Sequence, residues 1–249
     1  MDAALYETAY RLDETHWWFR ARRRVIFDIL DGVSPGPYQS ALDVGCGGNI
    51  HNTLALAKRA QRIVGLEISK EAIGFAKKHC PDLTIIKGAW PDVTLSQKFD
   101  IITLFDVLEH IEDEVRALKK AEETLVQGGT LVLTLPAYSL LWSEHDEYAH
   151  HKRRYTKKHL KHLITNNTSL RILRITYFNT LLFPPILAFR ISKYLLGIRS
   201  TATDFFPIPS WLNWLLEKVF GTERFLLRFL NLPVGVSILC IAQKPHHEQ

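Results

Sequence analysis

The fold of this chain is organised around one stretch of sequence, Ala41-Leu42-Asp43-Val44-Gly45-Cys46-Gly47-Gly48-Asn49-Ile50. The pattern predicts a short buried strand, an acidic residue, a glycine-rich turn and then a helix that begins near Asn52. Glycine is used where the backbone needs left-handed angles, or where a ligand approaches closer than a β-carbon allows. We therefore expect a small molecule to lie on Gly45, Gly47 and Gly48.

This turn does not fit the dinucleotide fingerprint G-x-G-x-x-G, because the third glycine would fall at Ile50. The acidic Asp43 immediately before the turn also suits a cationic ligand better than a pyrophosphate. Both features argue against a nicotinamide or flavin dinucleotide as the ligand.

Asp43-x-Gly45-x-Gly47, followed by Glu67 at the end of the next apolar run, resembles the first two motifs of class I S-adenosylmethionine (SAM)-dependent methyltransferases. The resemblance implies that the turn lies under the methionine half of SAM and that Glu67 binds the ribose hydroxyls. SAM carries a sulfonium, an ammonium and a diol but no phosphate, which agrees with the acid before the turn. The family usually has a further glycine where this chain has Asn49, a residue that tolerates left-handed angles.

Length, cysteines and charge limit the other possibilities. The 249 residues suffice for one large α/β domain, and the formal charge of +5 does not by itself imply nucleic acid. The three cysteines, Cys46, Cys80 and Cys240, are scattered and show no metal-binding spacing, so we expect a reducing compartment and no metal site. The first fifteen residues contain four acids and lack an apolar core, which predicts no signal peptide and a cytoplasmic location.

Residues 14–27 are rich in aromatic and arginine side chains and predict a helix before the first strand. The sequence His16-Trp17-Trp18-Phe19 resembles a methyltransferase subgroup in which the leading helix covers the cofactor cleft. That resemblance implies contacts to SAM from Trp18 and from an arginine, for which we take Arg23. The alternative is an aromatic helix that packs in the core, with its arginines in solvent.

Helix and strand patterns alternate along the rest of the chain. Helices are predicted at 53–59, 70–79 and 111–125, and strands at 63–66, 83–86, 100–104, 131–135, 170–177 and 236–242. The alternation predicts an α/β fold, with a Rossmann-like doubly wound seven-stranded sheet, an N-terminal helix and a helical insert near the C-terminus. Ligands are expected at the carboxyl ends of the strands.

The resemblance implies further contacts near the cofactor and the methyl group. Those to SAM are expected from Cys46, Ile68, Ala89, Trp90 and Phe105. Asp106 and His110 follow the fourth strand, where the family places the methyl group and the acceptor. The Asn/Asp-Pro-Pro-Tyr sequence typical of base and glutamine N-methylation is missing there. For His110 the alternative is simple surface solvation.

A polar segment after the fifth strand supplies the candidates for acceptor chemistry, because residues there face the cleft from the acceptor side. These are His145, Asp146, His151 and Tyr155. The general base is expected to be His110 or His151. Six cations occur between positions 152 and 161 without an acid, and this run is either a solvated face or a phosphate-binding surface.

We expect residues 1–249 to form one domain, with 178–233 as an insert before the last strand. The insert contains three apolar helical stretches at 186–198, 211–220 and 224–230, each interrupted by charged residues and too short to span a membrane. We therefore interpret it as a lid or a membrane-surface platform, in a monomer or a homodimer.

The sequence thus predicts a SAM-dependent methyltransferase acting on a small or lipid-linked acceptor, at oxygen, with possible peripheral membrane contact and no nucleic-acid partner. Two alternatives stay open. An NAD-dependent oxidoreductase would share Gly45, Gly47 and Glu67 but needs a glycine at position 50. A non-catalytic SAM-binding protein that docks on membranes would keep the pocket and lack an acceptor base.

Overall fold

The computed structural model describes residues 3–47, 50–197 and 208–246. The expectation that Gly48 contacts the ligand falls outside these ranges, as do Phe205 and Phe206 of the predicted insert.

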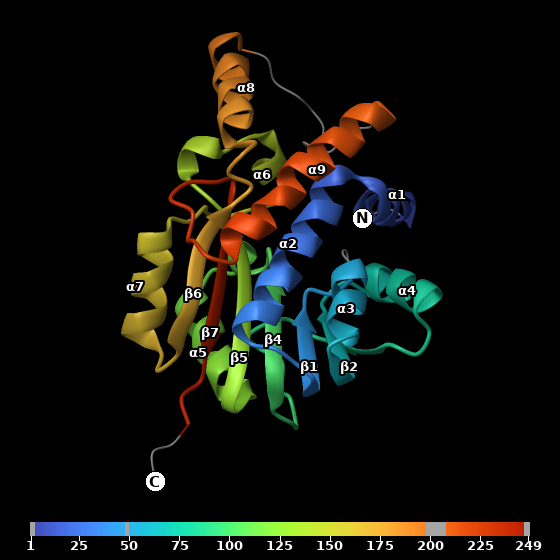
Figure 1. The fold of residues 1–249 in the computed structure, drawn as a ribbon. Coiled ribbons are helices and arrows are strands. Elements are labelled where there is room, and N and C mark those ends of the chain that lie inside the picture. The colour runs from blue at the N-terminus through green and yellow to red at the C-terminus, as the bar shows by residue number, and fades with distance from the viewer. Residues whose placement is uncertain (1–2, 48–49, 198–207, 247–249) are drawn as a thin grey trace.

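One seven-stranded sheet forms the centre of the molecule, with the strand order β3-β2-β1-β4-β5-β7-β6 (Figure 1). The strands are β1 (Tyr38–Val44), β2 (Ala60–Glu67), β3 (Thr84–Lys87), β4 (Phe99–Phe105), β5 (Leu125–Pro136), β6 (Arg171–Phe178) and β7 (Ser237–Gln243). Strands β1 to β5 pair in parallel, whereas β7 lies antiparallel between β5 and β6. The carboxyl ends of β1, β2, β4 and β5 therefore meet at one edge, as the sequence predicted.

Helices cover both faces of this sheet. They are α1 (Ala3–Thr15), α2 (Trp17–Val33), α3 (Ile50–Ala57), α4 (Lys70–His79), α5 (Glu114–Thr124), α6 (Glu144–Tyr148), α7 (Lys157–Asn167), α8 (Phe183–Leu195) and α9 (Ser210–Leu227). Buried side chains of α2, α3 and α9 pack on one face of the sheet, and those of α5 and α7 pack on the other. The doubly wound architecture is confirmed.

Most predicted elements are present, with several differences. Helix α4 has the predicted bounds, but α1, α6 and α7 were not predicted. Helix α5 begins at Glu114, after a 3₁₀ turn at Leu108–His110. Residues 211–220 and most of 224–230 are helical as predicted, but the break between them is wrong, because α9 runs without interruption from Ser210 to Leu227. Gly221 is buried inside α9 against the side chain of Arg24, so it serves close helix packing and does not end the helix.

The break between α1 and α2 is held by α9. Asn213 accepts a hydrogen bond from the backbone N–H of Trp17 (2.8 Å) and donates one to the carbonyl of Thr15 (3.0 Å). His16 caps the start of α2 by accepting the N–H of Trp18, and its burial lowers the pKa of its ring to about 4, so it is neutral at pH 7. The N-terminal helices and the C-terminal insert thus form one unit.

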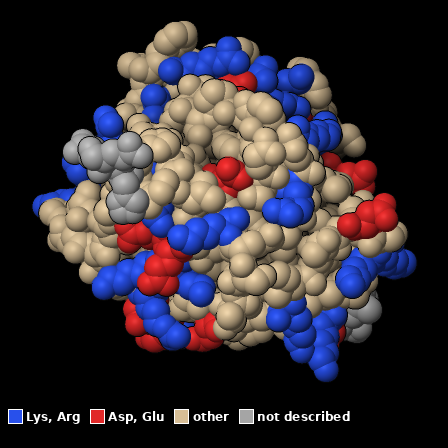
Figure 2. All heavy atoms as spheres, turned by 90° about the horizontal axis from the view of Figure 1, so that it is seen from below, with Lys and Arg blue, Asp and Glu red and all other residues tan. Residues whose placement is uncertain are grey.

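The charged side chains do not gather into a single patch on the face that Figure 2 shows. Lys and Arg lie around the margin of this face and are mixed with Asp and Glu. Basic and acidic side chains are therefore interspersed on this face.

A buried glutamate fastens α9 to the turn after β6. Glu223 is fully buried and accepts the backbone N–H of Leu181 at 2.7 Å, while Asn179 in the same turn is buried with a φ of 56°. Desolvation raises the pKa of Glu223 to about 7, although hydrogen bonds from the backbone oppose the shift. The carboxyl group is therefore partly protonated near neutral pH.

This pKa predicts a pH-dependent stability. The folded protein keeps a proton on Glu223 that the unfolded chain releases above about pH 4.3, so stability is retained below that pH and is lost as the pH rises towards 7. The Glu223→Gln variant should lose this part of the pH dependence, which amounts to at most about 3 kcal/mol. Urea unfolding at pH 5 and pH 8 measures it, and an equal pH response in both proteins would contradict the assignment.

Candidate functional site

The glycine turn lies where β1 ends and is tied to the end of β2. Gly45 has a φ of 77°, and its N–H donates to the carbonyl of Leu66 at 2.8 Å. A β-carbon on Gly47 would lie 2.9 Å from the carboxylate of Glu67 and still closer to Ala72. The turn therefore requires glycine at both positions, for backbone angle at Gly45 and for close approach at Gly47.

The acid before the turn is enclosed by hydroxyl groups. Asp43 is buried and accepts hydrogen bonds from Thr53 of α3 (2.5 Å) and Thr103 of β4 (2.6 Å). Desolvation raises the pKa of Asp43 to about 6, and the two hydroxyls oppose this shift. Asp43 thus connects three elements beneath the turn, and its carboxylate does not face open solvent.

Glu67 is placed for a ligand with hydroxyl groups. Its Oε1 accepts the N–H groups of Ile68 and Ser69, both at 2.9 Å, and its Oε2 accepts that of Gly47 at 3.0 Å. A carboxylate offers about four acceptor positions, so one on Oε2 is left for a ligand hydroxyl. Binding of the SAM ribose by Glu67 stays a prediction, and this acceptor position is compatible with it.

The other residues that the resemblance assigned to SAM differ in position. Ile68 is 64% exposed beside Glu67, whereas the thiol of Cys46 is buried against Gly65, and only the Cys46 backbone borders the turn. Trp90 is buried in the core and donates its indole N–H to the carbonyl of Ala117, so this polar group is already satisfied within the protein.

The remaining two of these residues, Ala89 and Phe105, were also assigned by resemblance. Ala89 is partly buried, and its carbonyl accepts the N–H of Val93. Phe105 is buried against Phe27 of α2, with ring centroids 5.9 Å apart. Phe105 thus links the end of β4 to the covering helix.

Helix α2 covers the strand ends, but a different arginine from the predicted one enters the site. Arg23 is bound to Asp13 of α1, with 2.7 Å between guanidinium and carboxylate, so the carboxylate that it meets is the protein's own. The guanidinium carbon of Arg22 lies 4.8 Å from the centroid of the Trp18 ring. Arg22 itself is almost fully buried, which the sequence signalled only by placing it on the apolar stripe of the helix.

Arg22 joins α2 to the ends of β4 and β5. Its Nη2 lies 2.6 Å from the carboxylate of Asp106 and donates to the hydroxyl of Thr134 at 2.5 Å. Asp106 also accepts a hydrogen bond from Thr134 (3.2 Å) and has a φ of 53°. Asp106 thus lies at the ends of β4 and β5 as expected, but its carboxylate is already paired with the buried guanidinium of Arg22.

A cavity of about 540 Å³ opens beside Asp106, between the strand ends and the insert. Its polar end is formed by Asp106, Glu109, His110, His145, His151 and Arg154. Its apolar walls include Trp17, Trp18, Phe19, Ile186, Phe189, Leu212, Leu216 and Val236. Helices α2, α8 and α9 thus enclose a pocket with one polar end and one apolar end.

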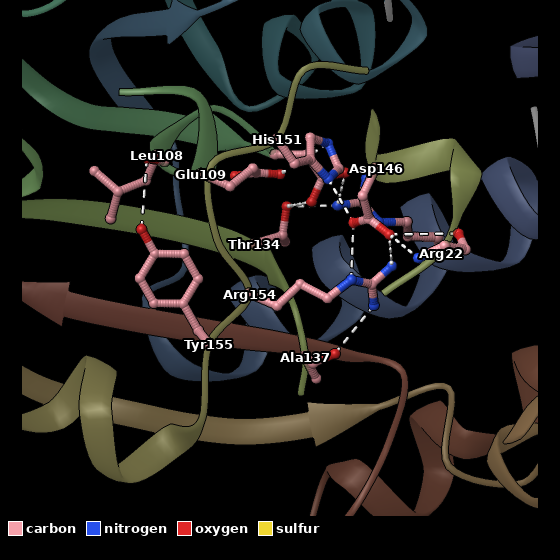
Figure 3. Close-up of polar contacts among 11 residues, drawn as sticks. Arg22, Leu108, Glu109, Thr134, Ala137, Asp146, His151, Arg154 and Tyr155 are labelled. Atoms are coloured by element: carbon pink, nitrogen blue, oxygen red, sulfur yellow. Dashed lines mark hydrogen bonds and ion pairs between the residues drawn. The ribbon is translucent and has the colours of Figure 1, made fainter. Parts of the chain in front are cut away.

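His151 is oriented by a buried acid (Figure 3). Its Nδ1 lies 2.8 Å from Asp146, which also accepts two hydrogen bonds from Arg154 at 2.8 and 2.9 Å. Burial alone would raise the pKa of Asp146, but the hydrogen bonds from His151 and Arg154 outweigh it and hold that pKa well below its usual range. An ionised Asp146 assigns the proton to Nδ1 and leaves the Nε2 lone pair of His151 directed into the pocket.

Two more predicted residues meet His151 there. The rings of His110 and His145 lie 4.8 and 6.0 Å from that of His151. Desolvation, together with the neighbouring His151, lowers the pKa of His110, so its neutral form is favoured at pH 7. The structure therefore brings together three histidines from two segments.

Tyr155 is not part of the pocket. Its side chain is fully buried and points away from the Asp146 cluster (Figure 3). Its hydroxyl donates to Glu114 at 2.7 Å. Burial and the contact with Glu114 raise the pKa of its hydroxyl. Its role is to pack the wall, and we do not retain it as an acceptor residue.

The basic run after His151 is largely neutralised. Lys152 pairs with Glu112, Arg153 with Glu114 and Arg154 with Asp146, while Lys157 donates to the carbonyl of Leu232. Three of its six cations thus pair with acids of the protein and a fourth binds a carbonyl, which leaves less of the run for a phosphate.

Comparison with known proteins agrees with this geometry. Residues 42–133 match the family described as Methyltransferase domain. The ubiquinone biosynthesis O-methyltransferase of Coxiella burnetii is 36% identical over 95 residues, which are 36% of this chain and 40% of that protein. The chain thus spans less than half the length of this curated relative.

Two solved structures share the fold across nearly the whole chain. The N-methyltransferase NodS from Bradyrhizobium japonicum, in complex with S-adenosylhomocysteine, has a TM-score of 0.57 at 16% identity, covering 95% of this chain and 92% of NodS. A putative methyltransferase from Bacillus halodurans has a TM-score of 0.59 at 16% identity, covering 88% and 98%. The fold, the glycine turn and the match over residues 42–133 agree with a methyltransferase domain of the class I SAM-dependent type. SAM fits this site as the cofactor, and the dinucleotide alternative is not retained.

The Arg22–Asp106 pair predicts a large loss of stability when one partner is removed. The Asp106→Asn variant leaves the buried guanidinium of Arg22 without its counter-ion, which should lower the free energy of unfolding by about 3 kcal/mol. In the double variant with Arg22→Met the buried charge is gone, so the loss should be smaller than in Asp106→Asn alone. Denaturant unfolding of the three proteins measures this, and additive losses would mean that the two side chains are not coupled.

Proposed function

We propose that this protein transfers the methyl group of SAM to a hydroxyl oxygen of a small acceptor that carries an apolar, lipid-like part. The observation that carries the proposal is the pocket between Asp106 and the insert, with histidines at its inner end and aromatic and aliphatic side chains along its walls. The relative from Coxiella burnetii, named a ubiquinone biosynthesis O-methyltransferase, supports an oxygen acceptor.

The protein's own part in such a reaction is alignment and proton removal. SAM supplies an electrophilic methyl group, so the pocket must hold the acceptor in line with it and exclude water. A hydroxyl acceptor loses its proton as the oxygen attacks, and His151 is the best-oriented base, because Asp146 fixes its Nδ1 proton and frees Nε2. His110 lies beside it as the second candidate.

Glu67→Ala tests the cofactor half of the proposal. Charge-assisted hydrogen bonds contribute roughly 1.5–3 kcal/mol each, so the variant should bind SAM at least about tenfold more weakly. Calorimetric titration with SAM measures the loss. Glu123→Ala, an exposed glutamate on α5, is the matched control and should bind like the wild type. Unchanged affinity in Glu67→Ala would overturn the assignment of the ribose site.

His151→Ala and His110→Ala test the acceptor half. A general base typically contributes about 10²–10⁴-fold, so at least one variant should lose turnover by that factor and keep its affinity for SAM. Turnover is followed as S-adenosylhomocysteine release with a series of apolar phenols as acceptors. Full activity in both variants would leave alignment alone as the source of catalysis. No turnover by the wild type with any acceptor would favour a non-catalytic SAM-binding protein.

The insert suggests how an apolar acceptor reaches the pocket. Helix α9 buries Phe220 and Leu227 but exposes Trp211, Trp214 and Phe225 on its outer side, and Phe229 beyond its end is 82% exposed. Exposed Trp and Phe with lysine and arginine nearby are typical of helices that lie in a membrane interface. Within the described part of the chain, no helix combines the length and hydropathy needed to cross a membrane.

We include peripheral docking on the cytoplasmic face of a membrane in the proposal. Wild-type protein should float with anionic liposomes, and less so at high salt, because anionic headgroups attract basic side chains. The Trp211→Glu/Phe225→Glu variant should stay in the soluble fraction and still bind SAM. Thr165→Glu/Asn166→Glu adds the same charge on α7 and should float normally. A wild type that does not float at low salt would remove docking from the proposal and leave a soluble acceptor.

A further inference from the structure

A buried carboxylate in the pocket has no hydrogen-bonding partner. Glu109, in the 3₁₀ turn after β4, is fully buried, and neither of its oxygens makes a hydrogen bond with another residue of the described chain. The nearby guanidinium groups of Arg22 and Arg154 are paired with Asp106 and Asp146, and neither makes a hydrogen bond to Glu109. An unpaired buried carboxylate is costly, and such groups normally bind a counter-charge.

Two imidazoles face this carboxylate. The Nε2 of His151 lies 4.0 Å from Oε1 of Glu109, and one ligand atom each from Glu109, His110 and His151 lies within 4.8 Å of the others. Two ligands bound at about 2.1 Å to one ion are at most about 4.2 Å apart. The distance from Glu109 to His151 already meets that limit. The ring of His110 is the most exposed of the three and would have to move closer to complete the set.

His151 also has the outer partner that metal-binding histidines usually have. Its other ring nitrogen is held by Asp146 at 2.8 Å, and Asp146 is in turn held by Arg154. Such a carboxylate–histidine contact orients the ring towards an ion and fixes the required tautomer. The contact between His151 and Asp146 would equally orient a general base, so it supports a metal site only together with the unpaired Glu109.

From these observations we infer that Glu109, His110 and His151 form a binding site for one divalent transition-metal ion at the inner end of the pocket. Two imidazoles and one carboxylate are ligands typical of zinc sites that keep positions open for water or a substrate oxygen. The sequence led us to expect no metal site because the cysteines lack metal spacing. That argument does not apply to a Glu–His cluster assembled from two separate segments.

An ion at this place changes how the pocket would handle an acceptor hydroxyl. Metal binding uses the Nε2 lone pair of His151, so the residue cannot be a ligand and a general base at the same time. A bound ion lowers the pKa of an oxygen ligand directly. The inference concerns the same pocket as the proposed function, but it is tested by binding alone, without SAM or acceptor.

The test is calorimetric titration of chelator-treated protein with Zn²⁺ at pH 7. Wild-type protein should bind one ion, and Glu109→Gln and His151→Ala should each lower the affinity at least about tenfold. Asp146→Asn, which keeps all three ligands but loses their outer partner, should weaken binding by about 10–100-fold. His162→Ala removes an exposed histidine of α7 outside the pocket and should bind like the wild type.

His110→Ala keeps the test decisive if changes at the buried Glu109 prevent folding, because His110 is the most exposed of the three residues and its loss should leave the fold intact. Weaker Zn²⁺ binding in this variant supports the site. No binding by the wild type, or equal binding by wild type, His110→Ala and His151→Ala, overturns it. A protein that binds Zn²⁺ as expected but shows no methyl transfer would contradict only the proposed function.

Discussion

The ion pair between Arg22 and Asp106 is the contact on which the site depends. It fixes α2 across the ends of β4 and β5 with a distance of 2.6 Å, and Arg22 is almost entirely shielded from water. A buried guanidinium is tolerated only when it is paired and hydrogen-bonded, which Asp106 and Thr134 together provide. Because α2 also forms one wall of the acceptor pocket, the same pair positions that wall relative to the strand ends.

The insert and the N-terminal helices complete the pocket from opposite ends of the chain. Asn213 of α9 forms hydrogen bonds with the backbone N–H of Trp17 and the carbonyl of Thr15, at the break between α1 and α2. Glu217 of α9 pairs with Arg24 of α2 at 3.1 Å. The apolar wall therefore contains residues from α2, α8 and α9, while the polar end comes from the segments after β4 and β5. An acceptor bound there would contact both the strand-end segments and the helices α2, α8 and α9.

Two acids of the pocket are held in opposite electrostatic states. Hydrogen bonds from His151 and Arg154 lower the pKa of Asp146, whereas burial, and then the nearby Asp106, raises that of Glu109 well above its usual value. Such divergence between neighbouring carboxyls usually marks a functional site, because each environment fits a different task. Here the ionised Asp146 orients His151, and Glu109 is left to meet a proton or a cation.

The sequence by itself determined the features that depend on local pattern: the glycine turn, the acid at the end of β2, the alternation that gives the doubly wound sheet, and the polar segment that carries His145 and His151. Periodicity and glycine placement follow from backbone geometry within a few residues, so they can be recognised without the fold. Only the tertiary structure decided that Arg22 enters the site while Arg23 binds Asp13, that Trp90 and Tyr155 turn into the core, and that Glu109 lies unpaired beside two histidines. Those outcomes depend on which side chains from distant segments pack together in one buried space, and the local sequence around each residue does not predict such contacts.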